Sequence, residues 1–134
     1  MLSSGIGPES FRYVIAGSDK KPTNNLDPSK PQLDDAEFNN EHGFWVGDGT
    51  YGLRPEVLES NFYAWRSTGD TKYLDNAVSA IDAFRKHLRV NETGGYAMLN
   101  NVNQPQDGII DNTPSFFFAE TLKYLYVRFA LGFR

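Results

Sequence analysis

The sequence predicts a mostly α-helical fold with short β-hairpins and long loops. Three observations support this prediction. Residues 71–89 repeat apolar side chains at helical spacing, and residues 115–131 form a long apolar run after a proline. The other apolar runs are short and bounded by glycine, proline and asparagine, which is typical of brief strands and turns. The length of 134 residues fits one ordinary domain.

Composition excludes several classes of protein. A hydrophobic content of 40% with 14% aromatic residues argues against disorder. Thirteen basic and 17 acidic side chains, with no basic cluster, predict no nucleic-acid partner. Without cysteine there is no disulfide framework, and no apolar stretch reaches the roughly 18 residues of a membrane span, so we expect no membrane contact from this segment.

The first third of the chain is polar and irregular. Residues 5–45 predict a long loop that contains one short strand at 11–15. Residues 44–46 and 51–53 flank a glycine-rich turn at 47–50, which favours a hairpin between those two runs.

Two helices follow. The first is expected over residues 54–67, opened by Pro55 and stopped by Gly69. Asp70 is a favourable N-cap for the second, over residues 71–89. One stripe of that helix is apolar, which indicates an outer helix with a single buried face; its members are Tyr73, Ala77, Ala80, Ile81, Phe84 and Leu88.

The last helix has a different pattern. Residues 94–99 predict a turn and strand and 104–108 a loop; Thr113 can then cap a helix that Pro114 opens. Residues 115–131 are apolar nearly all round, and such a helix is buried on every side. It needs walls that a chain of this length cannot easily supply.

Three carboxylates raise the question of chemistry. Glu120 lies within the apolar helix, where an ionised carboxylate is costly unless it is paired or hydrogen-bonded. It either pairs with Lys123 at i,i+3 spacing or points into a site. Glu56 and Glu59 share one face of a first helical turn. They are either capping charges or, together with Arg54, polar groups aimed at a pocket.

The residue types available narrow the reaction. Several carboxylates without cysteine, and with only two separated histidines, favour glycosidase-type acid and base chemistry over thiol or metal-hydroxide chemistry. No Walker, Rossmann, zinc-protease or EF-hand spacing occurs.

Several blocks, in order, resemble the C-terminal region of class I α-1,2-mannosidases, the glycoside hydrolase family 47. The three longest are residues 51–60 (YGLRPEVLES), 66–73 (RSTGDTKY) and 115–126 (SFFFAETLKYLY). Shorter matches are residues 5–9 (GIGPE), Gly95-Tyr96 with Asn101-Val102, and residues 61–66 (NFYAWR), the last most similar to fungal members. The resemblance implies that residues 1–134 are the C-terminal portion, and so an incomplete fragment, of a single catalytic domain.

The resemblance carries expectations about fold and activity. It implies a partial (α/α)7 barrel made of the last inner and outer helices. It implies calcium-dependent, inverting hydrolysis of terminal α-1,2-linked mannose in N-glycan processing, acting on a high-mannose N-glycan or another mannose-containing oligosaccharide. The expected location is the secretory pathway (endoplasmic reticulum or Golgi) or outside the cell.

The resemblance also assigns roles to residues of this chain. The family's proposed general base matches Glu56. Substrate-binding positions match Arg54, which contacts sugar, and Phe116, an aromatic under the sugar ring. Further carboxylates of the site match Glu59 and Glu120, near the sugar and the calcium's water shell, and Glu9 in the cleft.

The chain also departs from the family pattern. The general acid and a second catalytic aspartate belong to barrel turns before Gly5, and the calcium-binding threonine belongs to a block after the last helix. Thr113-Pro114 replaces what is commonly Met-Glu. We therefore expect no direct metal ligand here and no activity of the chain alone. The alternatives are a non-catalytic mannose-binding lectin-like homologue in glycoprotein quality control and an inactive truncated product.

Overall fold

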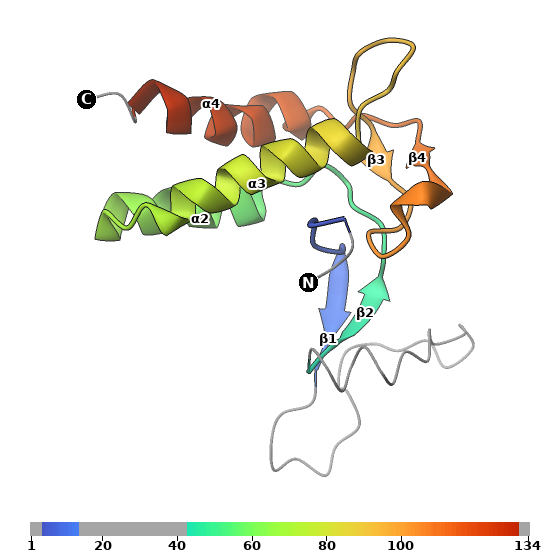
Figure 1. Cartoon of the computed structure of the whole chain (residues 1–134), viewed down its shortest axis with the longest axis horizontal. Helices are drawn as coiled ribbons and strands as arrows, with labels where there is room; N and C mark the ends of the chain where they lie inside the picture. Colours follow the sequence, from blue (N-terminus) through green and yellow to red (C-terminus); the bar gives the residue numbers. More distant parts are fainter. Residues whose placement is uncertain (1–3, 14–42, 132–134) are drawn as a thin grey trace.

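Three helices form one layer of the molecule, and two small antiparallel sheets lie beside one end of it (Figure 1). A computed structural model describes residues 4–13 and 43–131, with side chains described as far as residue 126. The helices are α2 (Glu56–Thr68), α3 (Lys72–His87) and α4 (Leu122–Leu131), and each contacts the other two.

The two sheets have two strands each. They pair β1 (Ser10–Arg12) with β2 (Trp45–Asp48), and β3 (Met98–Leu99) with β4 (Ile109–Ile110). A short 3-10 helix, η1 (Pro105–Asp107), precedes β4 in the predicted loop. Strand β1 overlaps the strand predicted at 11–15 and begins one residue before it. Residues 14 and 15 lie outside the described residues.

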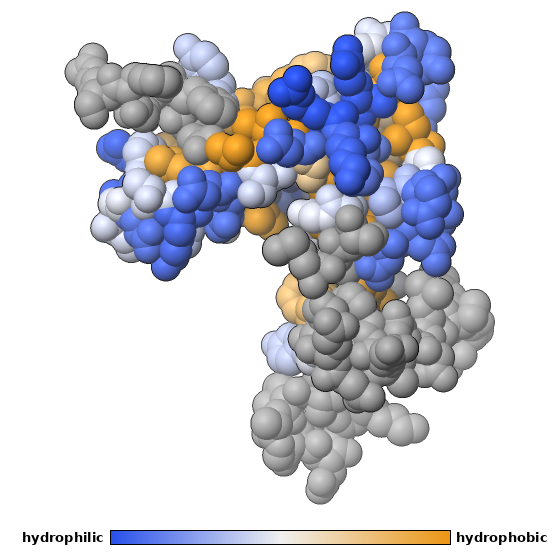
Figure 2. All heavy atoms as spheres, in the orientation of Figure 1, coloured by the Kyte–Doolittle hydropathy of each residue, from blue (hydrophilic) through white to orange (hydrophobic). Residues whose placement is uncertain are grey.

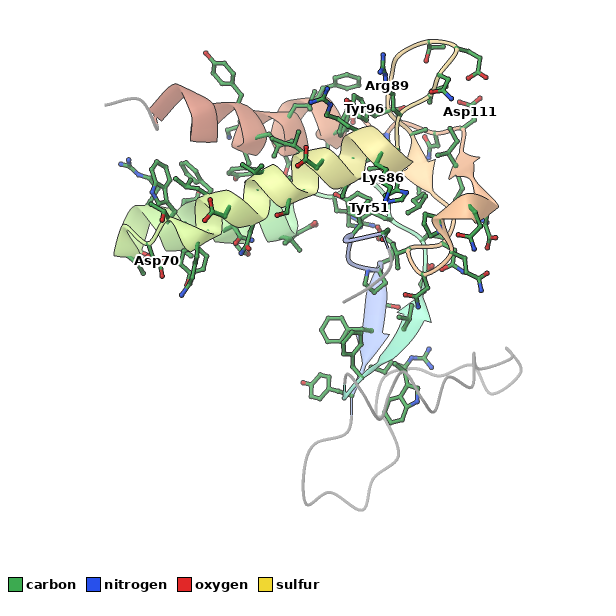
Figure 3. The ribbon with its side chains drawn as sticks, viewed as in Figure 1. Tyr51, Asp70, Lys86, Arg89, Tyr96 and Asp111 are labelled. Atoms are coloured by element: carbon green, nitrogen blue, oxygen red, sulfur yellow. The ribbon has the colours of Figure 1, made fainter. Side chains whose placement is uncertain are left out.

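The junction of α2 and α3 lies where the sequence predicts it. Gly69 adopts a left-handed φ of 72° and donates its N–H to the Trp65 carbonyl at 2.8 Å, so it closes α2. The Asp70 carboxylate accepts the Lys72 backbone N–H at 3.0 Å, but the N-cap position of α3 is Thr71 and not the predicted Asp70. Figure 3 shows Asp70 at the end of the helix layer that is far from Tyr51.

The apolar stripe of α3 is also confirmed. Ala77, Phe84 and Leu88 are buried, and the stripe faces the core. The rest of that core comes from the N-terminal segment, the residues before α2, the other two helices, the helical turn before α4, β3 and the loop after it; its members include Ile6, Leu53, Leu58, Leu99, Val102, Phe117 and Leu125.

The predicted hairpin between residues 44–46 and 51–53 is wrong. Strand β2 pairs with β1, and Tyr51 instead forms an isolated antiparallel bridge with Leu99. The reason is that the backbone of the expected turn bonds elsewhere: the Gly49 carbonyl accepts from Val102 at 2.8 Å and the Thr50 carbonyl from Glu9 at 2.8 Å. The segment therefore runs on as a connector between the two sheets and α2.

The start of the last helix also differs from the prediction. Thr113 does not cap it, because its hydroxyl donates to the Tyr96 carbonyl at 2.6 Å. The first turn is π-helical over η2 (Phe117–Thr121), closed by the Leu122 N–H bonding to Phe117 O, and only then does α4 begin.

One face of this helix is uncovered in the described part of the chain. Phe117 is buried, yet the neighbouring Phe118 is 64% exposed and Tyr126 is 72% exposed. Figure 2 shows apolar residues reaching the surface along the helix layer. The described residues therefore do not bury the last helix on every side, although its apolar sequence predicts such burial. No helix within residues 4–13 and 43–131 is long and apolar enough to cross a membrane.

Candidate functional site

A pocket of about 490 Å³ lies where the N-terminal segment meets the helices. Its walls are residues 5–9, the first residues of α2 and two residues of α3, Ala80 and Phe84. Tyr51 also lines it, and Figure 3 shows this tyrosine between the N-terminal segment and the helix layer. Three of the sequence-predicted site residues line this pocket: Glu9, Arg54 and Glu56.

Glu9 and Arg54 form the best-defined contact of the pocket. One carboxylate oxygen of Glu9 accepts the Gly52 backbone N–H at 2.6 Å, and the other accepts the Arg54 Nε–H. The Glu9 side chain is 14% exposed, whereas that of Arg54 is 51% exposed. The hydrogen bond and charge of Glu9 raise the pKa of Arg54. The guanidinium is thus anchored at Nε, and its outer nitrogens make no hydrogen bond within the described residues.

The connector before α2 is fitted closely around this pair. A Cβ on Gly52 would lie 2.9 Å from the Glu9 carboxylate, so a side chain there would displace that carboxylate from its present position. The Tyr51 hydroxyl donates to the Arg54 carbonyl at 2.9 Å. Burial raises the pKa of Tyr51, and the charges of Glu9 and Glu56 raise it further. The phenol therefore stays a proton donor at neutral pH.

The two carboxylates in the first turn of α2 have different surroundings. Glu56 is exposed at the pocket and has no hydrogen-bond partner among the described side chains. Glu59 lies one turn on, outside the pocket wall, and accepts the Tyr124 hydroxyl at 2.7 Å. That hydrogen bond is the main cause of a raised pKa of Tyr124. Glu56 is therefore free to act on a ligand, whereas Glu59 already has a partner.

The start of the last helix reaches the pocket through Phe116. The Arg54 guanidinium lies over the Phe116 ring, 5.7 Å from its centroid, in a cation–π contact. Glu120 does not join this cluster: it is exposed, and it makes no hydrogen bond or ion pair among the described residues. The ion pair considered between Glu120 and Lys123 is not formed, because the ammonium lies over the Tyr124 ring at 5.4 Å.

The side chains that could coordinate the predicted calcium ion do not cluster in the described residues. The described residues contain no group of three histidine, cysteine, aspartate or glutamate side chains that could hold a metal ion. Oxygen-rich coordination by six to eight ligands is the usual arrangement for Ca²⁺. The described part of the chain therefore does not fit a calcium site by itself, and we derive no step through the ion.

The comparison with known proteins identifies the family. The sequence profile described as Glycosyl hydrolase family 47 matches residues 1–131. The chain belongs to glycosyl hydrolase family 47. The chain is 41% identical over 128 residues to mannosyl-oligosaccharide alpha-1,2-mannosidase 1B of Aspergillus oryzae, covering 95% of this chain and 22% of that protein.

Two further family 47 relatives agree. The probable enzyme of the same name from Aspergillus clavatus is 42% identical over 92% of this chain and 22% of its own length. The solved α-1,2-mannosidase from Trichoderma reesei matches with a TM-score of 0.77 and 39% identity, over 96% of this chain and 25% of that one. The chain thus spans less than a quarter of the curated relatives it matches. Its described part is a helical portion of the family 47 fold with short strands, and it does not form a closed barrel.

Sequence reasoning missed three side chains that contact the predicted site residues or the residue before Arg54: Tyr51, Thr121 and Tyr124. Tyr124 lies four residues after Glu120, a spacing that could have indicated a shared helix face. Its contact with Glu59 spans 65 residues, and the contact of Thr121 with Leu53 spans 68. No local sequence signal marks either pair.

Proposed function

We propose that this chain supplies the base and sugar-contact side of the active site of a mannosyl-oligosaccharide α-1,2-mannosidase. The observation that carries the proposal is the pocket at which an unpartnered Glu56 lies beside an Arg54 anchored by Glu9 and stacked on Phe116. The curated relatives named above are α-1,2-mannosidases by name, and they support the substrate class.

The proposed reaction is hydrolysis with inversion. Glu56 accepts a proton from a water as that water attacks the anomeric carbon, and a general acid outside this chain protonates the leaving oxygen. Arg54 donates hydrogen bonds to sugar hydroxyls through its outer nitrogens, and Phe116 offers an apolar ring to a sugar face. Glu59 and Glu120 bind further sugar hydroxyls or ordered water near them.

The setting of the reaction is part of the same proposal. The substrate is a terminal α-1,2-linked mannose of a high-mannose N-glycan, and the enzyme works in the secretory pathway or outside the cell. Calcium is required by the whole enzyme, with its direct protein ligand outside these residues. The 134-residue chain alone releases no mannose, since a general acid is missing from it.

The test uses a hybrid enzyme, defined as the Trichoderma reesei α-1,2-mannosidase with its matching segment replaced by this chain. We expect it to release free mannose from an α-1,2-linked mannose oligosaccharide, with the β-anomer as the first product seen by proton NMR. Retention of the oligosaccharide on immobilised hybrid without release of mannose would instead support a lectin. An α-anomer as first product would overturn the inverting mechanism.

A further inference from the structure

The residue before Arg54 has an unusual backbone. Leu53 adopts a φ of 62°, and it is the one non-glycine residue with positive φ in the described ranges 4–13 and 43–131. Left-handed backbone is unfavourable for a residue with a branched Cγ and a Cβ, and it persists only where surrounding contacts impose it. Leu53 is fully buried, so the contacts that impose it are interior ones.

A buried hydroxyl supplies the polar contact. Thr121 is fully buried, and its Oγ1 donates to the Leu53 carbonyl at 2.6 Å. This is the carbonyl's one hydrogen bond among the described residues. A threonine within a helix ordinarily bonds a carbonyl of its own preceding turn. Here the partner is 68 residues away in sequence, in the connector that leads into α2.

The position of Thr121 links two parts of the pocket. It is the last residue of the π-helical turn η2, and Phe116 immediately precedes that turn. π-helical turns are uncommon and are frequent at functional sites. One hydroxyl therefore joins the turn that presents Phe116 to the connector that presents Arg54, and these two side chains meet in the cation–π contact.

We propose that Thr121 is a positioning residue for Arg54. Its hydroxyl holds the Leu53 carbonyl, which fixes the left-handed turn of Leu53 and so directs the Arg54 side chain between Glu9 and Phe116. This inference rests on the proposed function, which gives Arg54 its sugar-contact role. The placement of Arg54 itself can be measured without any enzymatic activity.

The alternative is that Thr121 only fills space and satisfies a buried carbonyl. Three forms of the 134-residue chain separate the two: the parent, Thr121→Val, which keeps the shape and removes the hydroxyl, and Thr121→Ser, which restores it. The readout is the Arg54 Nε–H signal in a nitrogen-15 correlation spectrum, assigned by its loss in Arg54→Lys. Arg66, which stacks on Trp65 at the far end of α2, is the internal control.

The expected result is a displaced, exchange-protected Arg54 Nε–H in the parent and in Thr121→Ser. In Thr121→Val the signal should move to the position of a solvated arginine, while that of Arg66 does not change. An unchanged Arg54 signal in Thr121→Val overturns the proposal. So does a solvated Arg54 signal in the parent, because the arrangement to be positioned would then be absent.

Kinetics of the hybrid enzyme provide the second arm. Thr121→Val should raise KM about tenfold with kcat changed less than about threefold, and Thr121→Ser should restore KM. Equal losses in Val and Ser would indicate a merely structural role and contradict the proposal. If the parent hybrid releases no mannose, the proposed function fails, and the NMR comparison still decides the role of Thr121.

Discussion

Two helix starts carry the predicted site residues, and the structure treats them differently. At the start of α2, Arg54 bonds Glu9 through Nε and is covered by the ring of Phe116. In the first turn of the last helix, Glu120 is exposed and makes no hydrogen bond or ion pair with a described residue. Both are charged side chains near the start of a helix, yet only Arg54 is held by such a partner among the described residues.

The difference between Arg54 and Glu120 lies in the partners that the described residues offer each of them. The Arg54 side is fixed because its partners, from residues 9, 52 and 116, all belong to the described chain. Glu120, Phe118 and Tyr126 of the last helix are all exposed among the described residues. The chain spans 22% of the length of the Aspergillus oryzae relative.

The largest expected effect on stability comes from two adjacent phenylalanines of the π-helical turn, one buried and one exposed. Phe117 is 2% exposed and its ring lies 5.9 Å from that of Tyr96, so Phe117→Ala should destabilise the chain by about 3–5 kcal/mol. Phe118→Ala, at 64% exposure, should change stability by less than about 0.5 kcal/mol. Urea unfolding followed by tryptophan fluorescence measures both.

Phe118 also tests whether the exposed apolar face of the last helix promotes self-association. We expect the parent chain to self-associate through exposed apolar side chains and Phe118→Ser to weaken that association, as seen by sedimentation velocity. A parent chain that sediments as a monomer at high concentration would argue that the face needs no cover.

Removing the carboxylate that anchors Arg54, compared with removing Glu120, should give the next largest difference. Glu9→Ala leaves the buried Gly52 N–H without its acceptor and frees Arg54, which should cost about 1–3 kcal/mol in free energy of unfolding. Glu120→Ala removes no hydrogen bond or ion pair seen among the described residues and should stay within about 0.5 kcal/mol of the parent. Equal losses in denaturant titrations of the two variants would show that Glu120 has a partner after all.

The smallest effect concerns Glu59, the carboxylate of α2 that contacts the last helix. The Tyr124 hydroxyl donates to it, and the pKa of Tyr124 is raised above that of an ordinary phenol, near 10. A raised folded-state pKa means that this hydrogen bond stabilises fully below about pH 10 and is lost as pH rises through the shifted pKa.

Tyr124→Phe should therefore remove one late-titrating phenol from the tyrosinate absorbance curve and lower stability slightly at neutral pH. Tyr126→Phe, at an exposed position on the same helix, is the control and should leave the late phase of Tyr124 in place. Loss of the same late phase in both variants would contradict the assignment.

Local signals were sufficient for much of the fold. Pro55, Gly69 and Asp70 act within one or two turns of their own positions, so the ends of α2 and α3 could be predicted from sequence. The pairing of β1 with β2 could not, because the partners lie on either side of a long intervening segment and the expected hairpin turn gives its carbonyls to Val102 and Glu9.

The candidate site was predictable as a set of residues but not as an arrangement. The family blocks indicated Arg54, Glu56 and Phe116, and the structure brings them to one pocket or its edge. The π-helical turn and the left-handed Leu53 have no signature in residue type, because leucine and threonine are ordinary in helices and strands alike. The two features are joined by a hydrogen bond across 68 residues, which only tertiary packing creates.

The central claim is that Glu56 is the general base of the pocket, and replacing it by glutamine in the hybrid enzyme tests this most directly. Glu56→Gln keeps the size of the side chain and removes its basicity, while Glu92→Gln makes the same change in an exposed turn and serves as the control. The account predicts that mannose release falls by about 10²–10⁴-fold in Glu56→Gln, with oligosaccharide binding retained and the control unaffected. Mannose release within about threefold of the parent would contradict it.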